Sequence, residues 1–100
     1  MYMKVMENET GNIVAVCDKE LIGKVLSEGD VALDLKTYAS FYKGDLVDEK
    51  KASSALAHGD TVSMNLVGER AVGIAKKLGI VPKGAVMLIS GVPHVQVYKI

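Results

Sequence analysis

Apolar and polar residues alternate with a period of two, or form short apolar runs, in six segments of the chain. Both patterns are typical of β-strands. A short polar stretch containing Asn and Gly separates the first two segments, which predicts a hairpin. The segment 86–90 is almost entirely apolar, so we expect it to form a central strand. The six predicted strands are residues 2–6, 12–17, 31–35, 61–66, 86–90 and 94–100.

Helical spacing of apolar residues marks the segments between these strands. The strongest pattern covers residues 67–78, whose apolar side chains fall on one helical face, and Gly79 follows as a stop signal. A second helix is predicted after Asp48, which is a suitable N-cap. A third, shorter helix is predicted after Asp18, although Gly23 within it lowers the helix propensity.

The order of these elements predicts an α+β fold, because strands and helices are mixed and hairpin-like pairs stand at both ends. We expect a single compact domain over residues 1–100. Its sheet should be mostly antiparallel or mixed, with about five to six strands and two to three helices. No internal repeat and no linker interrupts the chain.

Composition narrows the class of protein. Apolar residues make up 49% of the 100 residues, which excludes a disordered chain. Twelve basic residues balance twelve acidic ones, which excludes a polybasic surface over the whole protein. The chain has no apolar run long enough for a membrane span, and its first residues include acids where a signal peptide would be basic. We therefore expect a cytoplasmic protein without a membrane segment.

Cysteine and histidine content gives no sign of a metal site or cofactor. The single Cys17 lies in an apolar run, so we expect a buried side chain and not a reactive thiolate. His58 and His94 are far apart in the sequence and show no metal-ligand spacing. We expect neither a metal ion nor a cofactor.

The first candidate site is the junction between the predicted strand and helix at residues 65–70. A helix start offers free N–H groups to an anion, Gly68 permits close approach, and Arg70 adds a planar set of donors. The alternative is that Asn65 merely caps the helix and that Glu69 and Arg70 face solvent. Gly73, inside the helix, costs roughly 1 kcal/mol relative to Ala, which indicates close packing of some group against it.

The second candidate site is the segment 91–98. Gly91 permits a positive φ, and Pro93 stiffens the turn before the strand. Along that strand, His94, Gln96 and Tyr98 point to one face. Such a row suits a base, a sugar or a peptide edge, and His94 is the best titratable candidate. The alternative is an ordinary solvated face.

Three runs of the sequence, residues 15–18, 65–72 and 91–96, together resemble an archaeal family of small uncharacterised proteins, domain-of-unknown-function family 424. The resemblance covers the whole chain. It implies an archaeal, cytoplasmic protein with a compact α+β fold and, because family genes lie among translation genes, an RNA- or ribosome-associated role. The positions that the resemblance emphasises are Asn65, Gly68, Glu69, Arg70, Gly91, Pro93, His94 and Gln96.

Three hypotheses about function follow. The first is a binding module for RNA, the ribosome or a translation factor that uses residues 65–70 and 91–98. The second is an enzyme or a small-anion-binding protein, with Glu69 and His94 as catalytic candidates beside Asn65 and Arg70, and it requires both motifs to line one pocket. The third is a structural or protein-interaction domain, and the sequence does not indicate an oligomeric state.

Overall fold

The computed structural model describes residues 1–99 and shows the predicted α+β domain. In this part of the chain no helix has both the length and the apolar character that crossing a membrane requires. The strands are β1 (Tyr2–Met6), β2 (Asn12–Cys17), β3 (Val25–Glu28), β4 (Val31–Asp34), β5 (Asp45–Leu46), β6 (Thr61–Val67), β7 (Met87–Ile89) and β8 (Val92–Tyr98). The helices are a 3-10 turn (Lys19–Leu21), α1 (Ala39–Tyr42), α2 (Glu49–Ala57) and α3 (Glu69–Lys77).

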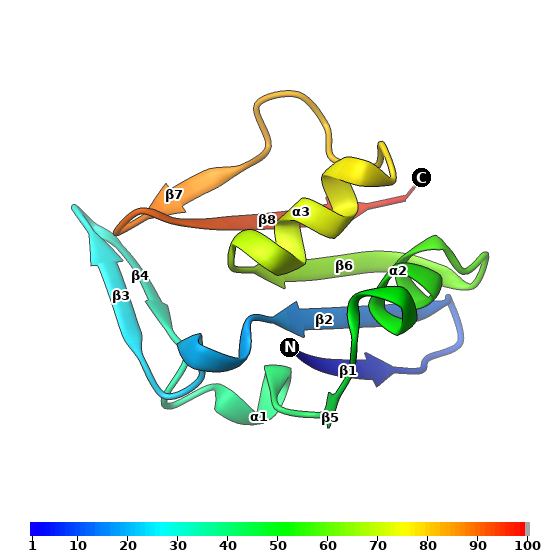
Figure 1. Cartoon of the computed structure of the whole chain (residues 1–100), viewed down its shortest axis with the longest axis horizontal. Coiled ribbons are helices and arrows are strands. Elements are labelled where there is room, and N and C mark those ends of the chain that lie inside the picture. Colours follow the sequence, from blue (N-terminus) through cyan, green and yellow to red (C-terminus); the bar gives the residue numbers. More distant parts are fainter. Residues whose placement is uncertain (100) are drawn as a thin grey trace.

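Six strands form the main sheet, in the order β5-β1-β2-β6-β8-β7 (Figure 1). The central neighbours β2 and β6 run parallel, and the other neighbouring strands run antiparallel. The predicted mixed sheet and its terminal hairpins, β1–β2 and β7–β8, are therefore confirmed. Strands β3 and β4 form a separate two-stranded sheet, which the sequence did not predict.

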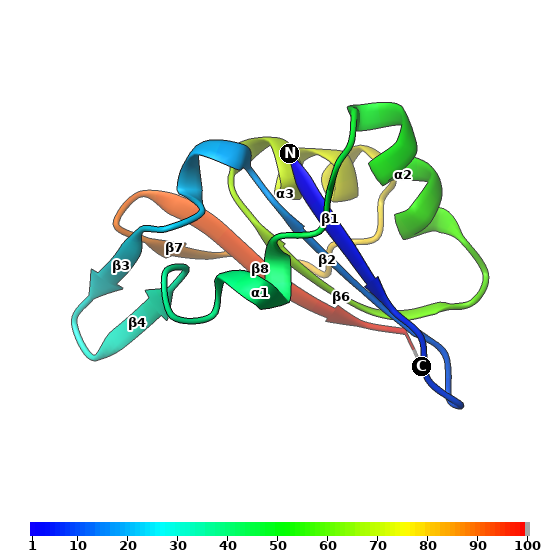
Figure 2. The same cartoon turned by 90° about the horizontal axis from the view of Figure 1, so that it is seen from below.

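Two layers cover the main sheet, one on each face (Figure 2). Helices α2 and α3 pack on one face, where Val14, Leu66 and Val95 are almost completely buried. The 3-10 turn and α1 contribute to a smaller core on the other face, around Ala15 and Tyr42. This second layer leaves Gln96 and Tyr98, on β8, exposed.

The predicted helix after Asp18 is wrong beyond its first turn. The chain forms only the 3-10 turn and then enters β3, which pairs with β4. Backbone hydrogen bonds explain this outcome: Gly23 N–H donates to Leu35 O at 2.9 Å, and Leu35 N–H donates to Lys24 O at 2.8 Å. Pairing with a later segment therefore overrides the helical spacing of apolar residues.

The prediction that residues 86–90 form a central strand is also wrong. Strand β7 lies at the edge of the sheet, and its Met87 and Leu88 are 50% and 58% exposed. The two-residue turn at Ser90 and Gly91 places β8, rather than β7, against β6. The predicted strand 94–100 corresponds to β8, which begins two residues earlier, at Val92, and ends at Tyr98; Ile100 lies outside the described residues.

Helix α3 begins later than predicted, because β6 continues to Val67. Asn65 is therefore a strand residue, and the interpretation of Asn65 as a helix cap is wrong. The cap comes from Asp18, at the end of β2, whose carboxylate accepts hydrogen bonds from Arg70 N at 3.1 Å and Ala71 N at 2.9 Å. Asp18 is only 3% exposed, so this contact joins the ends of two neighbouring strands inside the protein.

We predict that Asp18→Ala lowers the free energy of unfolding by about 3 kcal/mol, because it leaves two N–H groups at a buried helix start without an acceptor. The predicted cap Asp48 is confirmed and offers a matched control, since its carboxylate accepts from Lys51 N at 2.8 Å at an exposed helix start. Asp48→Ala should cost about 1 kcal/mol. Urea denaturation measures both values, and equal losses would contradict a special role for Asp18.

Candidate functional site

The two candidate motifs lie side by side on adjacent antiparallel strands. Asn65 is the cross-strand partner of Gln96, and Val67 is the partner of His94. Just beyond this ladder, Gly68 N–H donates a hydrogen bond to Pro93 O at 2.9 Å. The backbones of the segments 65–70 and 91–98 therefore meet, although they are more than twenty residues apart in the sequence.

Successive side chains of β8 alternate between the two faces of the sheet. Val95 and Val97 are buried in the core beneath α2 and α3. The intervening residues point to the other face, where His94 is half-buried and Gln96 and Tyr98 are exposed. The alternation predicted for this strand is confirmed.

Residues of both motifs line the same pockets, but Glu69 and Asn65, which the enzyme hypothesis places around one ligand, border different ones. Glu69 borders a small pocket of about 170 Å³ at the end of the sheet, together with Gly91 and Pro93. Asn65 and Gln96 border a separate pocket of about 170 Å³ on the sheet face. These two pockets share no residue, so Glu69 and Asn65 border separate spaces.

The expected anion position at the start of α3 is occupied by the protein itself. The Asp18 carboxylate already accepts from the first N–H groups of this helix. Gly68 is required there for two reasons: its φ is +109°, and a Cβ at this position would lie 2.3 Å from Asp18 Cγ. The close approach predicted at Gly68 therefore exists, but the approaching group is an internal carboxylate instead of a ligand.

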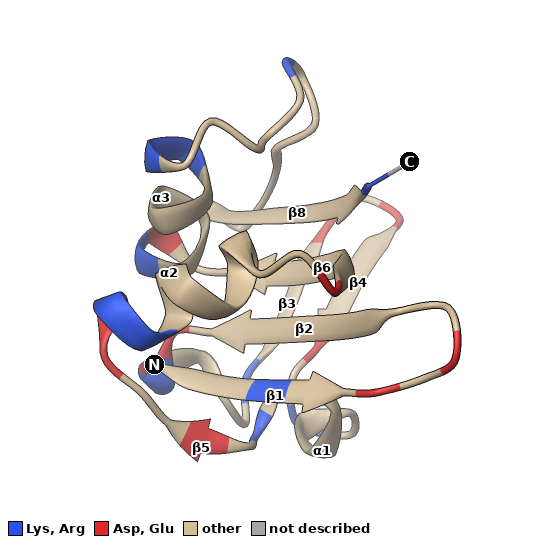
Figure 3. Ribbon diagram, turned by 90° about the vertical axis from the view of Figure 1, so that its right-hand side faces the viewer, with Lys and Arg blue, Asp and Glu red and all other residues tan. Residues whose placement is uncertain are grey.

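Arg70 lies in a groove of about 500 Å³ between the starts of α2 and α3. Its basic groups are Arg70, Lys77 and the amino group of Met1, and they face an equal number of acidic side chains. One of these acids, Glu49, pairs with Lys77 at 2.9 Å. Acidic and basic segments lie close together here (Figure 3), so the groove has no net charge to attract an anion.

The opposite face of the sheet carries a row of uncharged polar side chains on β6 and β8, which we call the polar panel. Cross-strand pairing aligns Asn65 with Gln96 and Ser63 with Tyr98. Strands β2, β6 and β8 contain no Lys, Arg, Asp or Glu, as their uniform colour in Figure 3 shows. The members of the polar panel are Ser63, Asn65, His94, Gln96 and Tyr98.

A hydrogen bond from α1 fixes the side-chain amide of Asn65 in the polar panel. Tyr42, on α1, is 4% exposed, and its hydroxyl donates to Asn65 Oδ1 at 2.5 Å. Burial raises the pKa of Tyr42 above its ordinary value, so the hydroxyl remains a donor throughout the neutral pH range. Asn65 Nδ2 is then the amide group that remains for a ligand in the pocket.

Histidine 94 is held at the end of the polar panel. Its Nδ1 lies 3.0 Å from Leu66 O. A carbonyl only accepts, so Nδ1 carries the proton in this contact and the neutral ring keeps Nε2 as an acceptor. The imidazole can therefore accept a hydrogen bond from a ligand.

Sequence reasoning missed several residues that shape this site. Phe41 and Ile13 border the sheet-face pocket with the polar panel, Tyr42 orients Asn65, and Asp18 occupies the helix start. The one available signal was the cluster of aromatic residues in the non-periodic segment 36–44. Asp18 gave no separate signal, because an acid after an apolar run also suits a local helix cap.

Gly73 differs from the expectation of close packing. A Cβ built at this position meets no heavy atom of the described chain within 4 Å. The residue instead lies between two open grooves, one shared with Arg70 and one shared with Leu88 and Pro93. No contact in residues 1–99 therefore requires a glycine here.

Cys17 is completely buried, as predicted. Burial, assisted by the nearby Asp18 and Glu20 carboxylates, raises the pKa of its thiol to about 12. Within residues 1–99 no group of three or more His, Cys, Asp or Glu side chains has an arrangement that could hold a metal ion.

The sequence profile described as protein of unknown function DUF424 matches residues 6–100. The chain belongs to the DUF424 family. This confirms the resemblance found in the sequence. No curated protein matches the chain significantly.

A crystal structure of an uncharacterised conserved protein from Methanopyrus kandleri is similar to this DUF424 chain, with a TM-score of 0.76 and 24% identity. The match covers 97% of this chain and 89% of that one. At this level of identity the likeness shows that the two proteins share a fold.

We predict opposite effects for alanine at two glycines of this DUF424 protein. Gly68→Ala should lower the free energy of unfolding by at least about 2 kcal/mol, because of its positive φ and the contact with Asp18. Gly73→Ala should raise it by roughly 0.5–1 kcal/mol, since the position is helical and open. Chemical denaturation tests both, and destabilisation by Gly73→Ala would contradict the open position.

We predict that Cys17 reacts with a thiol reagent at pH 8 at least about 100-fold more slowly in the folded protein than in denaturant. Its raised pKa also predicts that stability falls as pH rises from about 9 toward 12, because the unfolded chain then releases the thiol proton first. Absorbance assays and denaturation at several pH values provide the measurements. Rapid reaction of the native protein would contradict burial of the thiol.

Proposed function

We propose that this DUF424 protein is a binding module for single-stranded RNA and that the polar panel is its binding surface. The observation that carries the proposal is the alignment of Asn65, Gln96 and Tyr98 on neighbouring central strands beside a pocket. Amide side chains can hydrogen-bond base edges, and aromatic rings can stack on bases. Sheet surfaces that combine these groups are typical of single-strand recognition.

Tyr98 is the main stacking candidate, because its side chain is 70% exposed at the margin of the pocket. Stacking of one base on an aromatic residue contributes about 1–3 kcal/mol. Phe41, half-buried, borders the same pocket from α1. A base in this pocket would therefore have aromatic groups beside it and the amides of Asn65 and Gln96 within its wall.

Charge favours base recognition over backbone binding at this surface. The three strands nearest the pocket have no charged residues, and the net charge of the chain is +0. The affinity for single strands changes with salt by a slope of about −0.7 for each phosphate contacted. We therefore expect a shallow salt dependence, with a slope of about −1 to −2.

The partner that we propose is RNA of the translation machinery, in keeping with the role implied by the family resemblance. Co-sedimentation with ribosomal fractions, repeated after ribonuclease treatment, tests this part of the proposal. Loss of the protein from the fractions after treatment supports RNA as the partner. Retention after treatment would favour a protein partner instead.

We predict that Tyr98→Ala weakens binding to a fluorescent 12-nucleotide single-stranded RNA of mixed sequence at least about five-fold in fluorescence anisotropy, because the stacking contact is lost. Tyr38→Ala is the matched control, since Tyr38 is also strongly exposed, at 65%, but lies outside the polar panel. Its dissociation constant should stay within about two-fold of wild type.

Arg70→Ala locates the binding surface independently. Arg70 lies in the helix-side groove and not on the polar panel, so its removal should leave the affinity unchanged. A loss with Arg70→Ala and none with Tyr98→Ala would move the site to the helix side and overturn the assignment. Absence of binding at 50 mM salt, roughly the lower end of the range commonly tested, would overturn RNA binding altogether.

A further inference from the structure

A separate cavity of about 310 Å³ lies on the helix-covered side of the sheet, between α2 and the first two strands. Its apolar wall consists of Met3, Val5, Val14 and Ala55. Strand β5, the outer neighbour of β1, is only two residues long, and Val5 remains 42% exposed. The cavity is of the size that small ligands use, roughly 300–1,000 Å³.

Polar side chains of α2 and of the residue that follows it border this cavity. Lys51 and Ser54 are three residues apart and lie on the same side of the helix, and His58 comes directly after the last helical residue, Ala57. All three can donate hydrogen bonds, and Lys51 carries a positive charge. The cavity therefore combines an apolar wall with a margin of donors.

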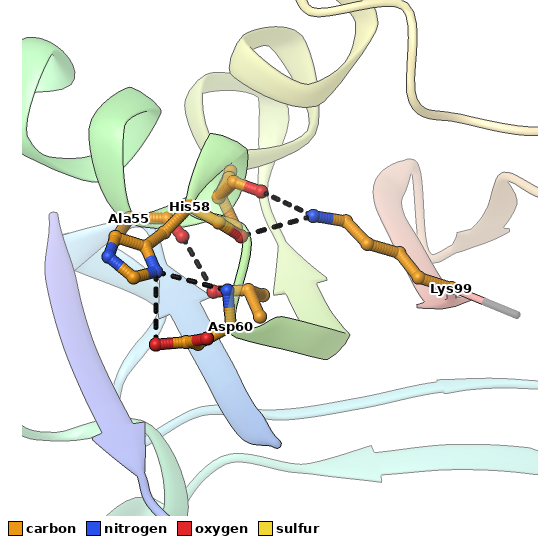
Figure 4. A network of polar contacts seen from close by, with 6 residues as sticks. Ala55, His58, Asp60 and Lys99 are labelled. Carbon is orange, nitrogen blue, oxygen red and sulfur yellow. Dashed lines mark hydrogen bonds and ion pairs between the residues drawn. The ribbon is translucent and has the colours of Figure 1, made fainter. Parts of the chain in front are cut away.

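The ring of His58 has a defined orientation (Figure 4). Asp60 N–H donates to His58 Nδ1 at 3.1 Å, so Nδ1 is an acceptor and the neutral ring carries its proton on Nε2. The Asp60 carboxylate lies 3.8 Å from the same Nδ1. The Nε2–H of His58 is therefore free to donate. Among the ion pairs of the described residues, the ring contacts one acid, Asp60, and this contact is at Nδ1.

The last turn of α2 is held firmly in place. Lys99 Nζ donates to Leu56 O at 3.2 Å and to His58 O at 3.5 Å, and Thr61 Oγ1 donates to Ala55 O at 2.8 Å (Figure 4). These contacts position the margin before a ligand arrives. Preorganisation of this kind lowers the ordering cost of binding.

We infer that this cavity binds a small aliphatic carboxylate. The aliphatic chain packs against Met3, Val5 and Val14, and the carboxylate accepts hydrogen bonds from Lys51 Nζ and His58 Nε2. Charge complementarity selects this ligand class, because the cavity margin offers donors and a cation above an apolar wall. The inference is independent of RNA binding, which uses the opposite face of the sheet.

Nitrogen-15 NMR titration of the whole chain with butanoate, hexanoate, octanoate and hexylammonium tests this inference. Hexanoate should cause saturable shifts confined to residues 3–5, 14 and 51–61, with a dissociation constant of about 1 mM. Each added methylene that is buried should tighten binding about four-fold. Hexylammonium has the same chain with the opposite charge and should not saturate.

Matched variants on α2 complete the test. Lys51→Gln should weaken hexanoate binding at least about five-fold, because it removes the cation at the cavity margin. Lys50→Gln removes the same charge from the neighbouring position, which does not border the cavity, and should leave the affinity unchanged. Equal effects of the two variants, equal binding of hexylammonium, or an absence of saturable shifts would overturn the inference.

Discussion

The hydrogen bonds between the Asp18 carboxylate and the start of α3 determine how the rest of the structure is arranged. They hold the end of β2 against the junction between β6 and α3, inside the protein. They also require glycine at position 68, because any Cβ there would collide with the carboxylate. The backbone of Gly68 in turn binds Pro93, so a single buried acid brings together three strand ends.

This arrangement separates residues that the enzyme hypothesis had placed around one pocket. Glu69 and Arg70 stay with α3, in a groove where acidic and basic groups balance. The face of the sheet opposite α2 and α3 carries the side chains of Asn65, Gln96 and Tyr98. The central strands have no charged residues. The RNA recognition that we propose for that face rests on stacking and directional hydrogen bonds, which act at contact distance and are screened little by salt.

Elements with local physical causes could be predicted from the sequence. The β1–β2 hairpin follows from a polar spacer between two apolar runs. Helix α2 begins directly after Asp48, because the Asp side chain accepts from the N–H three residues ahead. Strand β8 is buried at alternate positions, as its alternating sequence predicts. The segment after Asp18 was predicted incorrectly. Its helical spacing is weak, and pairing with Leu35 supplies hydrogen bonds that a short helix could not match.

The sequence by itself determined the fold class, the single Cys17 as a buried residue, and the segments in which site residues lie. Only the tertiary structure decided which groups meet. The partners of Asp18 are 52 and 53 positions away, and Tyr42 orients Asn65 across 23 positions. Periodicity and capping patterns reflect interactions within a few residues. These contacts depend instead on which strands lie next to one another in the sheet.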